Sequence, residues 1–249
     1  MFKWLYERKK PEMPDQKKIQ KLKQQLKKVT FFYLPYHTFR KYLEKKRNDR
    51  KIKNLQTFGY QVMNDLYSAL SQTDWKVFCV FGTLLGFVRD GDFIQFDNDI
   101  DIGILQEENF SWDELEKAMD TIHMKRIRQF SKEGKITEQT YGNEQLTVDF
   151  FGYVPVQDEM QSYEYFRDPA EIYQSTKDFS IRVWKSPMLK GIETKKINGV
   201  NILMPTNSEE YLESVYGSSW RVPDPDYDPD LDGKLTLKGK LGHCDLFLG

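Results

Sequence analysis

Cysteine and histidine are scarce in this sequence, and long hydrophobic runs are missing from it. The 249 residues include two cysteines and three histidines. Cys79 and Cys244 stand far apart in the chain, so we expect neither a disulfide framework nor a structural zinc site. No stretch approaches the roughly 20 apolar residues that a membrane-spanning helix needs. The sequence therefore predicts a chain that folds around an ordinary hydrophobic core.

The N-terminus also lacks the apolar segment of a secretory signal peptide, so we expect a cytoplasmic protein. Hydrophobic residues make up 39% of the sequence and aromatic residues 14%, which is enough for a packed globular body. This length predicts one large domain, or one domain with an appendage.

The charges are distributed unevenly, although the net charge is only -1. Residues 1–53 hold 18 Lys and Arg against 5 Asp and Glu, a local charge of +13, which leaves -14 for the other residues. We therefore divide the chain into a basic, mostly helical segment at 1–55 and an acidic body at 56–249. The basic segment fits either a solvated helix packed on the body or a contact with an anionic membrane surface. Nucleic acid is not an expected partner, because the body is acidic and no nucleic-acid-binding motif is present.

Helices and strands are expected to alternate along the body, which predicts an α+β class with α/β layers and a mixed sheet. A break in the N-terminal helix is expected at Pro35, and an irregular tail at 222–233. The expected helices are 15–29, 58–70, 83–90, 111–128 and 206–216. The expected strands are 75–81, 93–105, 145–156, 181–186 and 200–205.

Three aspartates alternate in the segment FDNDIDIG. A strand places residues i, i+2 and i+4 on one face, so Asp97, Asp99 and Asp101 are expected to point the same way. Carboxylates this close repel one another and are usually held by a hard divalent cation such as Mg²⁺ or Mn²⁺. The alternatives are an acidic solvated edge strand and a calcium-binding loop, although an EF-hand would need its glycine one residue earlier.

A glycine-threonine turn precedes these aspartates in the segment GTLLGFVR, directly after an expected buried strand. Gly82 is expected to let the backbone turn sharply and approach a ligand. The amides of Thr83 and Leu84, with the Thr83 hydroxyl, are expected to face a phosphate at a helix N-terminus, and Arg89 to reach the same group. The turn and the alternating aspartates together are more specific than either motif alone.

These segments resemble the central signature of the LicD/fukutin family in the stretch GTLLGFVRDGDFIQFDNDIDIG. YLESVYGSSWRVP resembles a second motif of the family, and QLTVDFFGY its later acidic strand. The resemblance covers roughly residues 60–225 and implies a nucleotidyltransferase-like mixed sheet flanked by helices. The family often has aspartate where this chain has Asn98, a position that on a strand would face away from the metal.

The resemblance implies an enzyme that transfers a phosphorylated alcohol, such as phosphocholine, ribitol phosphate or glycerol phosphate, from a CDP-linked donor. The implied acceptor is a hydroxyl of a cell-surface glycan, such as lipopolysaccharide or teichoic acid, or of its lipid-linked precursor. Carried over residue by residue, Asp99, Asp101 and Asp149 are the catalytic residues and ligands of Mg²⁺ or Mn²⁺, with Asp97 as an additional ligand. Asp149 is the candidate for deprotonating the acceptor hydroxyl.

The residues that bind the donor are harder to identify from the sequence. Arg182 and Lys185 fit contacts to the donor diphosphate, or exposed cations on an edge strand. Tyr216 and Trp220 fit packing of the last helix, or cation–π contacts to a choline ammonium group. Nucleotidyl transfer to a sugar, small molecule or protein is the alternative activity, and a non-catalytic binding protein a further one. The basic segment would place the enzyme peripherally at the inner face of the membrane.

Overall fold

The computed structural model describes the backbone of residues 16–168, 171–224 and 236–247, and the side chains of residues 41–168, 171–224 and 241–247. The chain divides into two compact units, Met1–Asp49 and Arg50–Gly249.

Helix α1 (Gln16–Leu70) forms the described part of the first unit and continues into the second. It runs without interruption through Pro35, where the sequence predicts a break. A proline removes one backbone donor, and the neighbouring turns of the helix keep theirs. The tail predicted to be irregular lies largely outside the described residues.

In its described residues, the second unit contains three further helices, one π-helical turn and ten strands. The helical elements are α2 (Phe81–Leu85), η1 (Gly86–Asp90), α3 (Trp112–Thr121) and α4 (Ser208–Tyr216). The strands are β1 (Val77–Cys79), β2 (Ile100–Leu105), β3 (Lys125–Lys132), β4 (Lys135–Gly142), β5 (Thr147–Val156), β6 (Glu159–Phe166), β7 (Asp178–Pro187), β8 (Ile192–Ile197), β9 (Val200–Pro205) and β10 (Thr236–Leu246).

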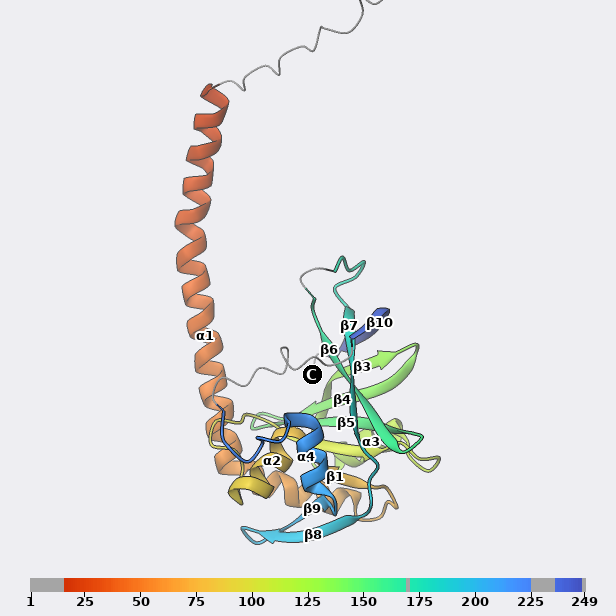
Figure 1. The fold of residues 1–249 in the computed structure, drawn as a ribbon. Helices are drawn as coiled ribbons and strands as arrows, with labels where there is room; N and C mark the ends of the chain where they lie inside the picture. The colour runs from red at the N-terminus through yellow and green to blue at the C-terminus, as the bar shows by residue number, and fades with distance from the viewer. Residues whose placement is uncertain (1–15, 169–170, 225–235, 248–249) are drawn as a thin grey trace, which may run out of the picture. The chain divides into compact units, whose positions relative to one another are not determined.

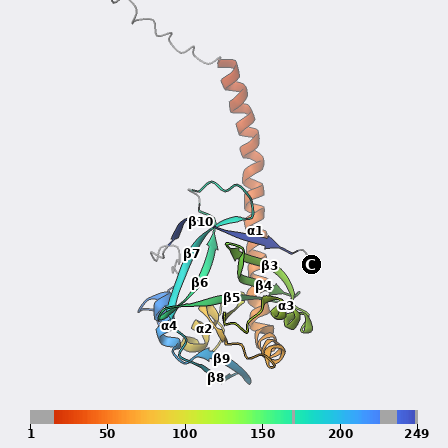
Figure 2. The ribbon, with the colours of Figure 1, turned by 90° about the vertical axis from the view of Figure 1, so that its right-hand side faces the viewer.

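Eight strands form one mixed sheet in the order β1-β2-β5-β4-β3-β10-β7-β6, and β6 also pairs with β5. This additional pairing closes the strands from β5 to β6 into a ring (Figure 1). β2 and β5 run parallel, whereas the other pairs are antiparallel, and β8 and β9 form a separate ribbon (Figure 2). A mixed fold of helices and strands is therefore confirmed. The layered arrangement is not confirmed, because β5 is long enough to pair with β2 and β4 along most of its length and with β6 at its end.

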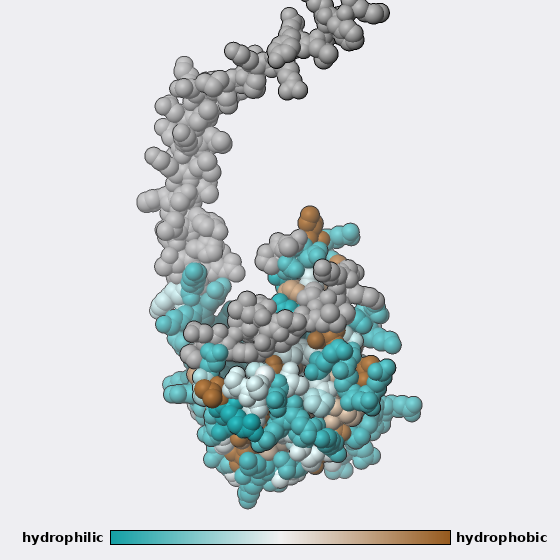
Figure 3. All heavy atoms as spheres, viewed as in Figure 1, coloured by the Kyte–Doolittle hydropathy of each residue, from teal (hydrophilic) through white to brown (hydrophobic). Residues whose placement is uncertain are grey.

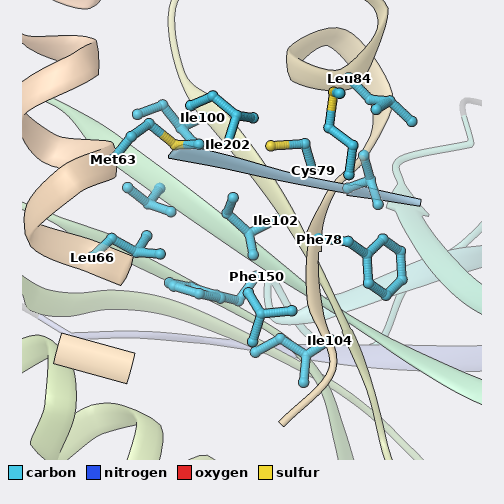
Figure 4. Close-up of a cluster of buried hydrophobic side chains, with 14 of the residues drawn as sticks. Met63, Leu66, Phe78, Cys79, Leu84, Ile100, Ile102, Ile104, Phe150 and Ile202 are labelled. Atoms are coloured by element: carbon cyan, nitrogen blue, oxygen red, sulfur yellow. The ribbon is translucent and has the colours of Figure 1, made fainter. Parts of the chain in front are cut away.

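The hydrophobic core lies between the C-terminal part of α1 and one face of the sheet (Figure 4). Met63 and Leu66 of α1 pack with Ile102 of β2 and Phe150 of β5, and all four side chains are fully buried. Successive residues of a strand point to opposite faces. Asp101 and Asp149 therefore lie on the other face of these two strands, together with the buried Leu105 and Tyr153.

The outer surface is mainly polar. On the face shown in Figure 3, hydrophilic side chains cover most of the described surface, and hydrophobic ones form small separate patches. Within the described part of the chain, no helix combines the length and the apolar character that crossing a membrane requires. Cys79 and Cys244 are both buried and free.

Candidate active site

The short connection from β1 to α2 shapes the candidate site. Phe81 begins α2 with a φ of 43°, a left-handed conformation that bulky residues rarely adopt. Its ring contacts those of Phe151 and Trp184, with centroids 4.9 and 5.3 Å away. Packing of this kind holds a strained residue in place, and strained residues cluster at functional sites.

Gly82 follows directly and faces two of the predicted metal ligands. A Cβ atom on Gly82 would lie 2.6 Å from Oδ2 of Asp97 and 3.6 Å from Oδ2 of Asp101. The backbone amide of Gly82 donates a hydrogen bond to the Asp101 carboxylate. The residue must therefore lack a side chain so that the carboxylates can approach the backbone.

The four predicted metal ligands form what we call the acidic cluster: Asp97, Asp99, Asp101 and Asp149. Asp101 lies in β2, directly beside Asp149 in the parallel strand β5. Asp97 and Asp99 precede β2, which begins at Ile100. The prediction that one strand presents Asp97, Asp99 and Asp101 is therefore wrong.

A tight turn explains this difference. The Asp97 amide donates to the Ile94 carbonyl at 3.0 Å, which turns the chain just before the strand begins. Phe96 is 67% exposed in this turn. The loop nevertheless brings the aspartates together, because the Asp97 and Asp99 side chains are hydrogen-bonded to each other.

Ionisation is disfavoured for three members of the acidic cluster. Burial raises the pKa of Asp97, Asp99 and Asp101, and neighbouring carboxylates raise it further for Asp99 and Asp101. The pKa of Asp99 rises to about 7, and that of Asp101 lies well above its usual range. Full ionisation of these carboxyl groups therefore requires compensating positive charge.

Asp149 is held by residues that the sequence analysis did not identify. Thr140 on the neighbouring strand β4 donates to Oδ1 of Asp149, and Nη2 of Arg128 donates to the same oxygen at 3.4 Å. The same Arg128 nitrogen contacts Oε1 of Glu138 at 3.5 Å. Burial, followed by the charge of Asp149, raises the pKa of Glu138 to about 8. These contacts extend the polar site from β5 across β4 to β3.

Arg128 was missed because the sequence predicts one helix through residues 111–128. The predicted start is confirmed, since the Ser111 side chain accepts a hydrogen bond from the Glu114 amide. The helix ends at Thr121, however, and His123 adopts a left-handed φ of 58°. Residues from Lys125 onward form β3. The alternation of charged and apolar residues in KRIRQF was the available signal for a strand.

A pocket of about 570 Å³ opens beside the acidic cluster. Gly82 and Arg89 of the first sequence motif line one part of it, and Tyr216 and Trp220 of the second motif line another. Asp97 belongs both to the acidic cluster and to the pocket wall. Two motifs that are distant in the sequence therefore line one pocket, and this pocket meets the acidic cluster at the Asp97 carboxylate.

The predicted phosphate-binding turn is arranged differently from the expectation. Thr83 is fully buried, and its Oγ1 accepts a hydrogen bond from the Asp101 amide at 2.9 Å. The Leu84 amide donates to the Val80 carbonyl at 3.0 Å, so it is not directed at an anion. Thr83 thus connects α2 to β2, and its phosphate-binding role stays a prediction.

Arg89 lies on η1 and lines the pocket. Its Nε and Nη2 atoms each donate to a carboxylate oxygen of Asp90 at 2.8 Å. This bidentate pair orients the guanidinium at the pocket wall. A contact between Arg89 and a donor phosphate stays a prediction.

Arg182 and Lys185, predicted together as diphosphate contacts, lie on opposite faces of β7. Arg182 is only 9% exposed, stacks on the Phe166 ring at 3.8 Å and lies 3.8 Å from Oε1 of Glu164. Lys185 is exposed and pairs with Glu159 at 3.0 Å. β7 is an interior strand of the sheet, so Arg182 is not an edge-strand cation. Their joint role at a diphosphate stays a prediction that this arrangement does not favour.

The chemistry of the acidic cluster fits a hard divalent cation. Its donors are carboxylate oxygens, of which those of Asp97 and Asp101 face the Gly82 backbone, and the pKa values of Asp97, Asp99 and Asp101 are raised. In the described ranges, no group of three or more His, Cys, Asp or Glu side chains is already placed to hold a metal ion. Metal binding by the acidic cluster therefore stays a prediction.

Comparison with protein families gives one match across this region. The model described as "LicD/FKTN/FKRP, nucleotidyltransferase domain" matches residues 74–207. The matched range includes Gly82, Arg89 and all four residues of the acidic cluster. The second sequence motif, with Tyr216 and Trp220, lies just beyond it.

Curated relatives match over shorter stretches. Uncharacterized protein RP689 of Rickettsia prowazekii (strain Madrid E) is 34% identical over 86 residues, which is 32% of this chain and 28% of that protein. Uncharacterized protein RT0683 of Rickettsia typhi (strain ATCC VR-144 / Wilmington) is 39% identical over 56 residues, or 22% of this chain and 18% of that protein. The chain thus spans less than a third of the length of these relatives.

Two solved structures are similar at low identity. The crystal structure of ANT(2")-Ia in complex with adenylyl-2"-tobramycin has a TM-score of 0.38 and 13% identity, covering 69% of this chain and 82% of that chain. The solution structure of ANT(2'')-Ia has a TM-score of 0.39 and 14% identity, covering 69% of this chain and 77% of that chain. At these values the comparison carries no weight for the chemistry of this chain.

Proposed function

This chain belongs to the LicD family, and on that premise we propose that it transfers a phosphorylated alcohol from a CDP-linked donor to a glycan hydroxyl. The transferred group would be phosphocholine or a polyol phosphate such as ribitol or glycerol phosphate. The acceptor would be a cell-surface glycan or its lipid-linked precursor. Transfer of a phosphate group onto glycans is the activity that family membership suggests, whereas the donor and the acceptor are our proposal.

One observation carries this proposal: Asp97 is shared between the acidic cluster and the 570 Å³ pocket. A transferase for a nucleotide-linked group needs a pocket for the nucleotide and a charged site for its phosphates, in direct contact. The pocket has the size of a small-molecule site, and its aromatic wall at Tyr216 and Trp220 suits a flat base or a choline group.

The acidic cluster would hold the metal, with Asp99, Asp101 and Asp149 as ligands and Asp97 as an additional one. When bound, Mg²⁺ or Mn²⁺ would neutralise the charge on phosphate oxygens during displacement. Gly82 would leave room for the carboxylates to converge, because no Cβ atom fills that space. Arg89 would orient the donor from the pocket wall.

Asp149 would take the proton from the acceptor hydroxyl. Its Oδ1 atom already accepts hydrogen bonds from Thr140 and Arg128, which fix the orientation of the carboxylate. The carboxylate would then receive the proton as the acceptor oxygen attacks the phosphorus that carries the alcohol. The bond between that phosphorus and the bridging oxygen would break, and CMP would leave with the bridging oxygen.

Nucleotidyl transfer is the second candidate function, because the matching family model is described as a nucleotidyltransferase domain. The two reactions use the same kind of site but break different phosphorus–oxygen bonds. Transfer of a phospho-alcohol releases CMP from a CDP-alcohol, whereas nucleotidyl transfer from a triphosphate releases pyrophosphate. The mass of the released product therefore separates them.

The basic segment at 1–55 would contact an anionic membrane surface at the inner face, where a lipid-linked acceptor is carried. Its local charge supports such a contact, since residues 1–53 carry a charge of +13. A lipid-linked acceptor would then be held close to the catalytic unit.

The proposal is tested by incubating the full chain and Mg²⁺ or Mn²⁺ with CDP-choline, CDP-ribitol, CDP-glycerol, CDP-ethanolamine and nucleoside triphosphates. Products are identified by mass spectrometry. We expect CMP release from one CDP-alcohol and loss of more than about a hundredfold in rate in Asp101→Asn, since this change removes a metal ligand. Asp158→Asn, in the exposed turn between β5 and β6, is the matched control and should keep the wild-type rate.

Two results would contradict this assignment. Pyrophosphate release from a triphosphate, without use of any CDP-alcohol, would move the chain to nucleotidyl transfer. Full activity in Asp101→Asn would remove the acidic cluster from the mechanism.

A further inference from the structure

Two cations flank the acidic cluster, Lys51 from α1 and Arg128 from β3. Nζ of Lys51 lies 3.5 Å from Oγ1 of Thr147, which shares one face of β5 with Asp149. Arg128 reaches Asp149 itself at 3.4 Å. The two cations therefore approach the same end of the acidic cluster.

Neither cation is held in a tight ion pair. Among the described residues, Lys51 has no carboxylate partner within ion-pair distance, and its contact to Thr147 is long. Arg128 keeps 39% of its side chain exposed, and its contacts to Glu138 and Asp149 measure 3.5 and 3.4 Å. By comparison, Arg89 binds Asp90 at 2.8 Å through two nitrogens. Lys51 and Arg128 thus retain donor groups for a further anion.

The pocket touches the acidic cluster at Asp97, whereas Lys51 and Arg128 touch its surroundings at Thr147 and Asp149 of β5. The phosphates of a donor bound in the pocket would lie beside carboxylates, and these repel an anion. Positive charge near Asp149 offsets that repulsion, and arginine and lysine are the side chains that bind phosphate. Lys51 and Arg128 supply positive charge there.

We propose that Lys51 and Arg128 bind the phosphate groups of the donor. This inference rests on the proposed function, and it assigns to these two residues the contact that the sequence analysis gave to Arg182 and Lys185. Arg182 is engaged with Phe166 and Glu164, and Lys185 lies on the other face of β7. Lys51 also lies outside the range that the family model matches, so this contact comes from α1 of this chain.

The charge of these residues gives the proposal a distinctive signature. Replacing a phosphate-binding cation beside the acidic cluster weakens the binding of an anion. The same change strengthens the binding of a metal ion, because a positive charge that competes with the metal is gone. If the two residues only supported the fold or the position of Asp149, both affinities would fall together.

The experiment measures two affinities by titration calorimetry in full-length Lys51→Gln and Arg128→Gln. The first is the affinity for Mn²⁺ alone. The second is the affinity for a nucleotide, measured with Mn²⁺ present. The nucleotides tested are CDP-choline, CDP-ribitol, CDP-glycerol, CDP-ethanolamine, ATP and CTP. We expect each variant to bind the nucleotide that the wild-type chain prefers about tenfold more weakly than wild type does. Each variant should bind Mn²⁺ at least as tightly as wild type. Lys53→Gln removes an exposed charge from the same helix and should change neither affinity.

Each outcome is informative. Weaker nucleotide binding with unchanged or tighter Mn²⁺ binding supports the inference. If the preferred nucleotide is a triphosphate, that result still supports the inference and contradicts only the proposed function. Unchanged affinity for a CDP-alcohol in both variants overturns the inference and leaves the proposed function standing. Parallel loss of both affinities assigns the residues a structural role, and a wild-type chain that binds no nucleotide overturns both proposals.

Discussion

Gly82 lies directly against the acidic cluster and leaves no room for a side chain. In Gly82→Ala the new Cβ atom would meet Oδ2 of Asp97 at 2.6 Å. The carboxylate of Asp97 can rotate away, so we expect the free energy of unfolding to change by less than about 1 kcal/mol. The change would disturb the geometry of the metal site. We therefore expect kcat/KM to fall at least about tenfold, as is typical when the surroundings of a metal site are altered.

The matched control for this change is Gly191→Ala. Its Cβ atom would meet Thr206 at 3.4 Å, an ordinary contact distance. Thermal unfolding and steady-state kinetics should show wild-type behaviour for this variant. Equal kcat/KM in Gly82→Ala and wild type would show that Asp97 contributes nothing to the reaction.

Asp99 links the stability of the metal-free protein to pH. Its pKa is raised from 3.8 to about 7 in the folded chain. Below the lower pKa, the Asp99 carboxyl group is protonated in both the folded and the unfolded state. Above the higher pKa it is charged in both, and the folded state is destabilised by the buried charge. Stability should therefore fall as pH rises from about 4 to about 7, which is the sign expected for an acid with a raised pKa.

Asp99→Asn removes this dependence. Solvent screens part of the cost at this half-buried group, so we expect the variant to gain roughly 2 kcal/mol at about pH 8 and little at about pH 4. Chemical denaturation with a chelator present measures the difference. Glu144→Gln, at an exposed position in the turn between β4 and β5, should leave the pH profile unchanged. A larger gain at the acidic end would reverse the sign and contradict the assignment.

At the scale of elements, one hydrogen bond connects α4 to the sheet below the candidate site. The hydroxyls of Tyr153 on β5 and Tyr211 on α4 lie 2.6 Å apart, and both side chains are fully buried. Tyr211→Phe keeps the ring packing and removes this bond, so we expect a loss of about 1 kcal/mol in unfolding free energy. Tyr163→Phe is the control, because its hydroxyl makes only a long contact to Lys132 at 3.4 Å. Equal stability of both variants would show that the buried bond contributes nothing.

The elements that the sequence predicts well are those with a strong local pattern. The strand at 145–156 is confirmed as β5, and the last helix as α4, ended by Gly217 at a φ of 79°. The turn into α2 and η1 ends at Gly91, also with a positive φ of 73°. In each case a run of apolar residues or a glycine determines the local structure by itself.

The elements that it misses depend on partners elsewhere in the chain. The sequence predicts the end of a helix where β3 begins, because the charged residues there also fit a helical pattern and no glycine marks the end of the helix. β4 and β6 alternate polar and apolar residues only weakly, since both line a closed ring in which each face is partly buried. Pairing with distant strands determines the structure of β3, β4 and β6, and the local sequence pattern gives little indication of that pairing.

The candidate site follows the same division. The acidic residues and Gly82 can be recognised as motifs in the sequence. The structure places Asp97 and Asp101 at Gly82, and Asp149 beside Asp101. Arg128 and Glu138 reach the site only because β3 and β4 pair beside β5. Lys51 reaches it from a helix outside the motif. Nothing in the local sequence marks these three residues as neighbours of the aspartates.

At the scale of the whole molecule, charge separates the two ends of the chain. Deleting residues 1–30 removes much of the basic segment and should weaken binding to vesicles that contain phosphatidylglycerol, by about 1 kcal/mol for each basic residue near the surface. Binding to pure phosphatidylcholine vesicles should stay weak in both proteins. Turnover of a soluble acceptor should be unchanged, because the acidic cluster lies in the other unit. Equal sedimentation of both proteins with anionic vesicles would contradict a membrane role.

Closure of the sheet through β6 has a consequence for how copies of this protein behave at high concentration. In the part of the chain that the structure describes, β1 is the terminal strand of the eight-stranded sheet, and it has three residues. Exposed edges are where one protein adds a strand to another and where aggregation begins. With so short an edge, the sheet offers little template for such addition. The eight-stranded sheet should therefore resist strand addition until the pairing of β5 with β6 opens.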